Sequence, residues 1–487
     1  MQVGYVKHNE HLLNWVIKHR TRLSFDYPVP NLRVLLNVNA DISLASKIVE
    51  NISEPSCEPA LKNLDVYVLS TLQQVCLDEN QPEWFLLWVE KLLRVCEVRR
   101  FELQERIRKN VKNDQTARIT ALRLCLLFLN CFYLYNDARY INIVLKIIDL
   151  KWIKFGDMRD SLPHQCSEEI FLKVLVALLV ENGITILRDV DWRPQITPLI
   201  EERIIDKIDL PMHKICDVAD GVVIFSPNPM GIATLCVAEL LKVHGINVRA
   251  IVIRRLFNFK RLYEEIKRDG LKWVYRKITN KLLFRKVSYR GYNFETIVDF
   301  ASKIGVTHSN VHAWCRHNNV DVVVCDTLND QVVHDYLRKT KPRLVAFVGG
   351  GIINEKTLDL SGDGVLNCHG GLLPWYRGLD LYEWSLLEKH PDAIGCSTHF
   401  MSKYVDEGDV FYLYRHDIKG LDTFDALIKF GEVASIKLLV YTIIKYFNNR
   451  IKPVRQNRKD GKQFFYMHPR LVEIAQRNLN ELLNKSN

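Results

Sequence analysis

The sequence predicts an α/β protein in which a mostly α-helical N-terminal domain precedes a domain built around a parallel β-sheet. Three observations lead to this prediction. Residues 1–205 contain very little glycine, and their apolar residues recur at intervals of three and four, as on one face of an α-helix. Beyond residue 211, runs of valine, isoleucine and leucine alternate with helix-like segments. Such continuous apolar runs are typical of parallel strands that are covered by helices on both faces.

The first segment, residues 1–205, shows helical periodicity most clearly at 84–98, 119–135 and 168–181. It contains no repeat of fixed period and no catalytic signature. These features favour a helical docking or scaffolding domain, and the sequence assigns it no more specific role.

The second segment, residues 215–420, is expected to form the parallel sheet. It begins with a β-α-β unit, because two apolar runs flank a helix-like stretch that ends at Gly245. The expected strands are 220–226, 246–255, 320–327, 343–351 and 364–371, and the expected helices are 232–245 and 330–341. Ligands of such sheets bind at the carboxyl ends of strands, which here lead into the loops 225–231, 349–354 and 367–371.

The third segment, residues 421–487, is expected to be a short helical C-terminal tail. A long helix is predicted at 422–447, with Asp422 or Thr423 as its N-cap. A final helix is predicted to begin at Leu471.

The chain has 487 residues and a formal net charge of +10, and this charge is concentrated in one segment. Between Arg249 and Arg290 there are fourteen basic and three acidic residues, a sum of +11, so the rest of the chain sums to 10 − 11 = −1. The core of this segment, 255–290, is interpreted as a basic helical insert in the second domain. A general nucleic-acid-binding protein carries a more widespread basic surface, so nucleic acid is not expected as a partner.

The twelve cysteines indicate a reducing compartment, because none forms a CxxC pair and most lie within apolar runs, as buried free thiols do. The N-terminus lacks the apolar core of a signal peptide. The most apolar stretch, 124–134, is too short to span a bilayer. We therefore expect a cytoplasmic protein.

Three polar residues of the second domain indicate acyl-transfer chemistry. Asn367 and His369 alternate at the end of a predicted strand, so their side chains leave the same face. Asp406 follows in a second strand-to-turn segment, VDEGDV. An amide can donate to a developing oxyanion, an imidazole can move or stabilise a proton, and a carboxylate can orient the imidazole. No metal is expected in this site.

These residues belong to a longer pattern that resembles the formyltransferase family, which includes glycinamide ribonucleotide and methionyl-tRNA formyltransferases. The resemblance extends over about 218–425 and is densest at 343–410. It implies a Rossmann-like formyltransferase domain. The matching positions are Asn367, His369, Leu372, Leu373, Pro374, Arg377 and Gly378, then Gly395, Cys396, Thr398 and His399, then Val405, Asp406 and Gly408.

The resemblance implies that 10-formyltetrahydrofolate donates the formyl group and that a primary amine accepts it. It also implies that Asn367 and His369 stabilise the tetrahedral oxyanion, while Asp406 orients His369 and assists proton transfer. The glycine run 349–351 departs from the family, and either a close approach of backbone to the folate ring or a flexible strand end would explain it. The residues implied in folate binding are Gly350, Gly351, Ile352, Ile353, Tyr404 and Val405.

Two further departures from the family concern the acceptor. The loop after the first strand contains Pro227 and Pro229, which donate no N–H to a phosphate, so glycinamide ribonucleotide is a poor candidate. The residues after the helix at 422–447 are too few for the barrel domain of a tRNA formyltransferase. We expect a phosphorylated or nucleotide-linked amine, in particular an amino sugar on a nucleotide or related carrier, as in the amino-sugar N-formyltransferases of polysaccharide pathways.

Three interpretations of the basic insert at 255–290 stay open. Its apolar residues recur at helical spacing, and aromatic residues interleave with the basic ones. The insert can form a solvated helical flap with one packed face, or it can supply positive charge near an acceptor diphosphate. Its third interpretation is peripheral contact with an anionic membrane surface where lipid-linked sugars are handled.

Three alternatives to amine formylation also stay open. A formyltetrahydrofolate hydrolase would keep the same three polar residues and transfer the formyl group to water. A methionyl-tRNA formyltransferase-like enzyme would act on initiator tRNA. A catalytically inactive homologue would serve as a scaffold in a biosynthetic complex. The sequence does not indicate the oligomeric state.

Overall fold

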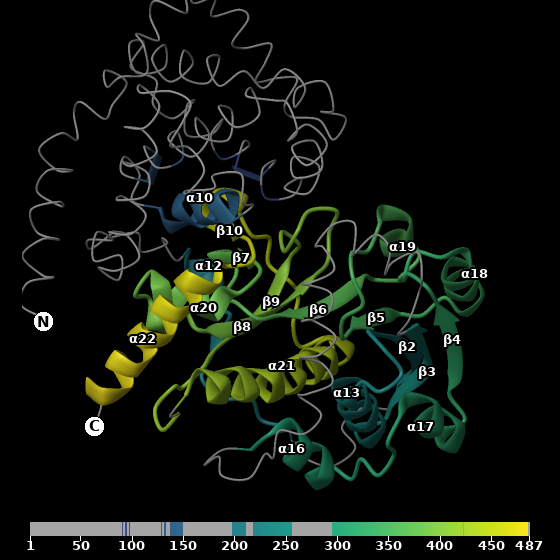
Figure 1. The fold of residues 1–487 in the computed structure, drawn as a ribbon. Coiled ribbons are helices and arrows are strands. Elements are labelled where there is room, and N and C mark those ends of the chain that lie inside the picture. The colour runs from purple at the N-terminus through teal and green to yellow at the C-terminus, as the bar shows by residue number, and fades with distance from the viewer. Residues whose placement is uncertain are drawn as a thin grey trace, which may run out of the picture. The chain divides into compact units, whose positions relative to one another are not determined.

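The computed structural model describes residues 90, 93–94, 97, 128, 131–132, 137–149, 197–210, 218–255, 295–421 and 423–485 (Figure 1). The chain divides into two compact units, Met1–Asp191 with His468–Leu471 and Trp192–Met467 with Val472–Asn487. Most of the predicted helical domain and nearly all of the basic insert lie outside the described residues. None of the described helices is long and apolar enough to cross a membrane.

In the first unit, the longest described element is the helix α10 (Ala138–Asp149). Its apolar side chains from Ala138 to Ile147 are buried, and so are its two cations. Arg139 pairs with Asp137 at an Nη2–Oδ2 distance of 2.7 Å, and Lys146 pairs with Glu97 at an Nζ–Oε2 distance of 2.6 Å. These partners offset the cost of removing the two cations from water.

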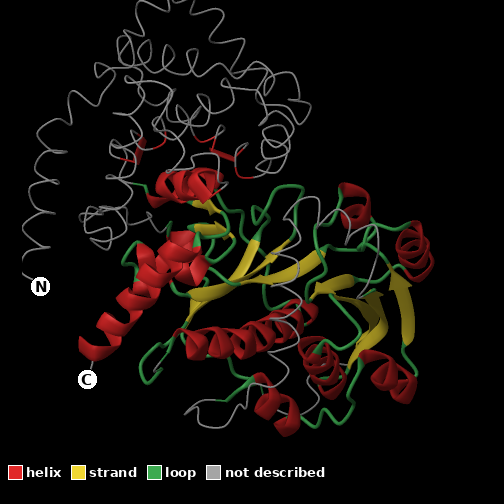
Figure 2. Ribbon diagram, viewed as in Figure 1, coloured by secondary structure: helices red, strands yellow, loops and turns green. Residues whose placement is uncertain are grey.

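The second unit is built around an eight-stranded sheet with the order β1-β9-β8-β6-β5-β2-β3-β4 (Figure 2). The five strands from β6 to β4 are parallel to one another, as the alternation of apolar runs and helices predicted. The strands are β1 (Ile204–Ile205), β2 (Val218–Ser226), β3 (Ile246–Arg254), β4 (Asp321–Cys325), β5 (Leu344–Phe347), β6 (Val365–His369), β8 (Gly395–Phe400) and β9 (Val410–Arg415).

The sheet is mostly parallel, as the sequence predicted, and β8 is the strand that departs from this direction. β8 runs antiparallel to both of its neighbours, β6 and β9. Only residues 401–409 join β8 to β9, and so short a connection cannot make the crossover that parallel neighbours require.

Helices cover both faces of the sheet and create two apolar cores (Figure 1). Along β2 the side chains alternate between them: Val222 and Ile224 point into one core, Val223 and Phe225 into the other. The first core contains α13 (Ile232–Val243), α16 (Ile297–Lys303), α17 (Val311–Asn318) and α21 (Phe424–Phe447), and the second contains α18 (Gln331–Thr340) and α19 (Glu355–Asp359).

The remaining elements precede the strands of the sheet, connect them or follow them. The helix predicted at 422–447 is α21, and its N-cap is Thr423, whose hydroxyl accepts a hydrogen bond from the Ala426 N–H. The other described elements are α12 (Pro198–Glu201), α20 (Leu381–Leu387), α22 (Pro469–Lys485), the 3-10 turns η2 (Pro391–Ala393) and η3 (Arg458–Asp460), and a two-stranded sheet of β7 (Tyr376–Gly378) and β10 (Lys462–Phe464).

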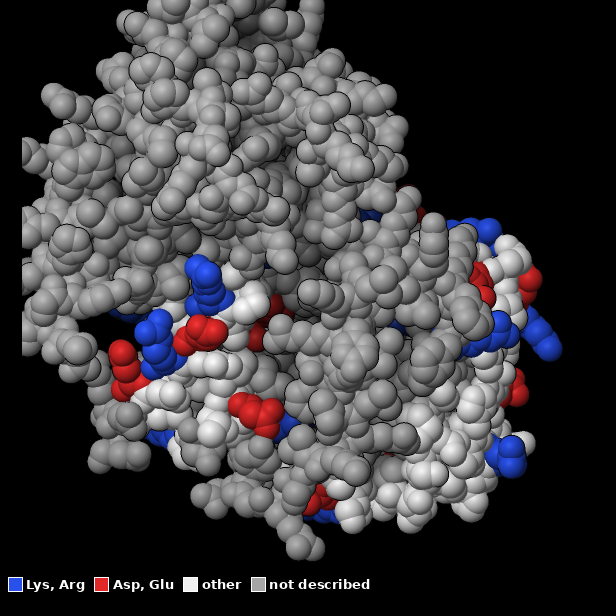
Figure 3. Space-filling view, in the orientation of Figure 1, with Lys and Arg blue, Asp and Glu red and all other residues white. Residues whose placement is uncertain are grey.

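The charged side chains of the described surface are mixed in sign. On the face shown in Figure 3, the described Lys and Arg side chains lie among Asp and Glu side chains. Most of the excess positive charge of the sequence belongs to the segment 256–294, which lies outside the described residues.

Candidate active site

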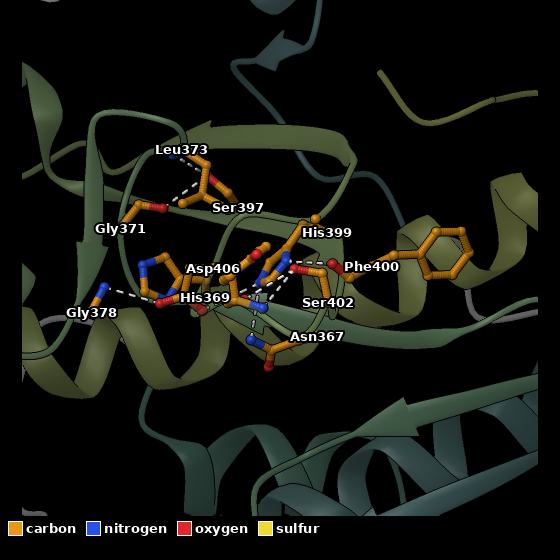
Figure 4. Close-up of polar contacts among 12 residues, drawn as sticks. Asn367, His369, Gly371, Leu373, Gly378, Ser397, His399, Phe400, Ser402 and Asp406 are labelled. Atoms are coloured by element: carbon orange, nitrogen blue, oxygen red, sulfur yellow. Dashed lines mark hydrogen bonds and ion pairs between the residues drawn. The ribbon is translucent and has the colours of Figure 1, made fainter. Parts of the chain in front are cut away.

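The predicted catalytic residues Asn367 and His369 both lie on β6, and both pair with residues of the neighbouring strand β8 (Figure 4). The strand register places His399 of β8 opposite Asn367. The Asn367 Nδ2 atom is 3.2 Å from the His399 Nε2 atom. The structure thus brings the predicted pair together and adds a second histidine to it.

Asp406 lies in the β8–β9 loop, and its carboxylate lies between the two histidines. Its Oδ2 atom is 3.5 Å from the His369 Nδ1 atom, and its Oδ1 atom is 3.6 Å from the His399 Nε2 atom. The Gly378 N–H donates a hydrogen bond of 2.9 Å to the same Oδ2 atom. The loop itself is held by Gln456, whose amide donates to the backbone oxygen of Asp406 at 2.8 Å. The predicted proximity of Asp406 and His369 is therefore present.

The contacts of His369 determine where its protons lie. Its Nε2 atom is 3.0 Å from the backbone oxygen of Tyr376, and a carbonyl oxygen can only accept, so Nε2 carries a hydrogen. Its Nδ1 atom then faces the carboxylate of Asp406. This second contact holds the ring in one orientation beside the carboxylate.

His399 is 1% exposed, and its contacts also fix its tautomer. Its Nδ1 atom is 2.8 Å from the backbone oxygen of Phe400 and must donate to it, which leaves Nε2 of the neutral ring as an acceptor. Burial lowers the pKa of His399 to about 4, against the opposing charge of Asp406, so the ring is neutral near pH 7. Neutral His399 therefore accepts one hydrogen from the Asn367 amide nitrogen and leaves the other available.

His399 is the site residue that the sequence did not assign a role. It was identified only as a match to the family pattern. The available signal was its position on a strand next to the Asn-x-His strand, but the antiparallel register that places it opposite Asn367 was not predicted.

A cavity of about 840 Å³ lies beside Asn367. Its wall is formed by the loop after β2, the end of β5, the start of α20 and the first half of α21. Gly349 and Gly370 line it with backbone, while Asp380, Glu383 and Glu432 line it with carboxyl groups. This cavity is large enough for a sugar-sized or larger molecule next to the candidate catalytic amide.

The glycine run has a structural explanation. Gly349, Gly350 and Gly351 have φ angles of 129°, 133° and 109°, which other residues rarely adopt. A Cβ atom at Gly350 would lie 2.6 Å from the Leu328 Cδ1 atom. Arg254 at the end of β3 donates a hydrogen bond of 2.7 Å to the Gly350 oxygen. Backbone geometry and packing thus require glycine here, whatever binds nearby.

The other residues implied in folate binding fall into two classes. Ile352, Tyr404 and Val405 are exposed large apolar side chains, at 86%, 46% and 45%. The side chain of Ile353, by contrast, is buried in the core beneath α18, so only its backbone can contact a ligand. The ion pair of Lys403 with Glu355, at 3.7 Å, joins the two loops that carry these residues. Among the described residues, no group of three His, Cys, Asp or Glu is placed to hold a metal ion.

Comparison with known proteins identifies a family for part of the chain. Residues 297–443 match a family model described as formyl transferase. The bifunctional polymyxin resistance protein ArnA of Wigglesworthia glossinidia brevipalpis is 28% identical over 170 residues, 35% of this chain and 26% of that protein. Methionyl-tRNA formyltransferase of Bacteroides thetaiotaomicron is 23% identical over 198 residues, 39% of this chain and 61% of that protein. The chain thus spans less than two thirds of either relative.

Solved structures of formyltransferases also align with the chain. Glycinamide ribonucleotide transformylase 1 of Symbiobacterium toebii is 14% identical, with a TM-score of 0.32, and the alignment covers 48% of this chain and 94% of that one. A likeness of this size supports no argument about activity. The family match confirms the predicted resemblance.

Proposed function

Because residues 297–443 match the formyl transferase family, we propose that this protein transfers a formyl group from 10-formyltetrahydrofolate to a primary amine. The observation that carries the proposal is the contact network of Asn367, His369, His399 and Asp406, which we call the catalytic cluster, at the edge of the cavity. We propose that the acceptor is an amino sugar on a nucleotide or related carrier.

The cluster is suited to stabilise a tetrahedral intermediate. When the amine attacks the formyl carbon, negative charge develops on the formyl oxygen. The Asn367 amide hydrogen that is not engaged by His399 can donate to that oxygen, and the His369 ring beside it can move or stabilise a proton. Asp406 orients that ring, and it can take up the proton that the amine loses.

The loops around residues 350 and 404 suit a flat donor ring. The folate supplies the formyl group on a nitrogen that leaves as the new amide forms. We propose that the backbone of Gly350, Gly351, Ile352 and Ile353 holds its pteridine from one side. The exposed side chains of Tyr404 and Val405 supply apolar surface on the other side.

The test replaces Asp406 by Asn in the full chain and measures formyl transfer from 10-formyltetrahydrofolate to a panel of nucleotide-linked amino sugars, read by mass. The amide keeps an acceptor for the Gly378 N–H but loses the negative charge, so we expect turnover to fall by about 10²–10⁴-fold. Asp409→Asn is the matched control, because Asp409 is an exposed residue of the same loop.

Each outcome decides between functions. Full activity of the Asp406→Asn variant, with both variants folded by circular dichroism, would refute the mechanism. Equal consumption of the donor without any amine would identify a hydrolase instead. Wild-type protein that does not bind the stable analogue 5-formyltetrahydrofolate would remove the proposed function altogether.

A further inference from the structure

The chain that follows α21 returns to the strands and loops that carry the catalytic cluster. We call residues 454–464 the clamp segment. At its start, the Val410 N–H of β9 donates to the Val454 oxygen at 2.8 Å, and the Val454 N–H donates back to the Val410 oxygen at 2.7 Å. At its end, β10 pairs in parallel with β7. The clamp segment therefore contacts β9 and β7, which flank the catalytic cluster in the fold.

Strand β7 contacts two residues of the catalytic cluster through its backbone. The Tyr376 oxygen accepts a hydrogen bond of 3.0 Å from the His369 Nε2 atom, and the Gly378 N–H donates to the Asp406 carboxylate at 2.9 Å (Figure 4). In β10, Phe464 lies opposite Gly378, and its buried ring stacks on the ring of Tyr376 with centroids 5.0 Å apart. A displacement of β10 would therefore move the backbone groups that hold both catalytic side chains.

Gln456 joins the clamp segment to the loop between β8 and β9. Its amide nitrogen donates to the backbone oxygens of Asp406 and Gly408 at 2.8 and 2.6 Å, whereas its amide oxygen has no hydrogen-bond partner among the described residues. Asp406 has a φ angle of 55°, in the left-handed region that residues other than glycine adopt uncommonly. Such a conformation persists when surrounding contacts hold it, and the buried Gln456 amide supplies two of them.

A largely buried ion pair joins β7, the same loop and the clamp segment. The Arg377 Nη1 atom lies 3.0 Å from the Glu407 Oε1 atom. Its Nη2 atom donates to the backbone oxygens of Arg458 and Gly461 at 3.1 and 2.9 Å. A guanidinium group can make these contacts at once because its donors form a rigid fork. Glu407 follows Asp406 in the chain, so the pair restrains the loop next to the catalytic carboxylate.

We infer that the clamp segment is a working part of the active site and that Gln456 is a positioning residue for Asp406. The inference rests on the proposed function in assigning Asp406 to catalysis. The two hydrogen bonds of Gln456 hold the loop backbone, so that the Asp406 carboxylate stays between His369 and His399. Arg377 supports the same loop through Glu407.

The test replaces Gln456 by Met, which is similar in length and removes the donor, in the full chain. We expect kcat for formyl transfer to fall by about 10- to 100-fold, because a small displacement of a catalytic group is costly. The KM for the amine should stay within about three-fold of the wild-type value, because Gln456 does not line the cavity. Asn478→Leu is the matched control. The Asn478 amide of α22 donates to the Leu386 oxygen of α20 at 2.9 Å and holds no residue of the catalytic cluster, so kcat should stay within about two-fold of the wild-type value.

The same substitution in the Asp406→Asn background distinguishes positioning from a general loss of stability. If Gln456 acts through Asp406, Gln456→Met should lower the remaining turnover of Asp406→Asn by no more than about two-fold. Losses that multiply in the two backgrounds would overturn the inference, and so would full activity of the folded single variant. Should Gln456→Met fail to fold, Gln456→Asn, whose shorter amide cannot reach both backbone oxygens, is measured in the same two backgrounds with the same expectation.

Hydrogen exchange of the loop at 401–409 requires no catalysis and separates this inference from the proposed function. We expect its amides to exchange about ten-fold faster in Gln456→Met than in the wild type, and at the wild-type rate in Asn478→Leu. If this result is accompanied by a wild type that transfers no formyl group, the protein retains the clamp and the formyltransferase proposal is lost. If the wild type is active and the variant exchanges at the wild-type rate, the proposal stands and the inference is overturned.

Discussion

The catalytic cluster reaches the cavity through Asn367, and three carboxyl residues, Asp380, Glu383 and Glu432, which we call the acidic wall, line the same cavity. The protein satisfies the polar groups of these two regions differently. In the cluster, the polar groups of Asn367, His369, His399 and Asp406 contact one another or a nearby backbone group. In the acidic wall, Glu383 has no donor from another described residue, and burial raises its pKa. Groups that must keep one orientation during a reaction are satisfied by the protein. A buried carboxyl group without such a partner is free to accept hydrogen bonds from a ligand.

Two replacements of His399 test whether contacts within the catalytic cluster hold the Asn367 amide in its orientation. In His399→Asn the new side chain can reproduce the Nδ1 donor to Phe400, but it lacks the acceptor for Asn367. In His399→Gln the side chain reaches far enough to supply that acceptor. We expect turnover to fall by about a hundred-fold in the Asn variant, because the Asn367 amide loses its orientation, and by clearly less in the Gln variant.

The KM for the amine should stay within about three-fold of the wild-type value in both variants, because His399 does not line the cavity. Steady-state kinetics, with unfolding curves to verify the fold, provide the measurement. Equal losses of turnover in the two variants would mean that His399 serves only in packing. The hydrogen bond from Asn367 to His399 would then not orient the amide.

The sequence predicted the catalytic cluster better than it predicted the acidic wall. Asn367 and His369 are two residues apart on one strand, so strand geometry alone places them on one face. Asp406 was expected nearby because it follows a second strand-to-turn segment, and the family resemblance supported its role, although no local rule indicates that its loop folds back to β6. His399 required the antiparallel register of β8, which short-range patterns do not determine.

The acidic wall could not be predicted for a different reason. Glu383 and Glu432 are 49 positions apart (432 − 383) on two helices, and each helix pattern alone is compatible with many crossings. What selects the crossing is the fit of Gly431 against Tyr382, a packing detail that depends on the whole domain. The expectation of a phosphorylated acceptor arose from the basic insert and from family resemblance, and it stays a prediction.

Gly431→Ala tests whether that crossing assembles the acidic wall. The new methyl group would lie 2.4 Å from the Tyr382 hydroxyl oxygen and 2.9 Å from its ring, so the Tyr382 side chain or the helices must shift. We expect the free energy of unfolding to fall by about 1–3 kcal/mol. Gly370→Ala is the control in the same cavity, because a Cβ atom there meets nothing within 4 Å. A Gly431→Ala variant as stable as the wild type would show that the contact is not the constraint.

Glu383→Gln tests whether burial of the charged carboxyl group in the acidic wall lowers the free energy of unfolding. The pKa of Glu383 is raised from 4.5 to about 7 by burial and by Asp380, and Glu432 adds negative charge on the opposite helix, where Lys429 partly balances it. Below pH 4.5 the group is protonated in both the folded and unfolded states and costs nothing. Between pH 4.5 and 7 it ionises in the unfolded state first, so the wild type loses stability as the pH rises, and the loss is complete slightly above pH 7.

Chemical denaturation at about pH 4 and about pH 8 should therefore show the Gln variant gaining about 1–2 kcal/mol on the wild type at the higher pH. If the two proteins differ in free energy of unfolding by the same amount at both pH values, water or a bound cation already satisfies Glu383. The polar groups of the acidic wall would then be satisfied as fully as those of the catalytic cluster.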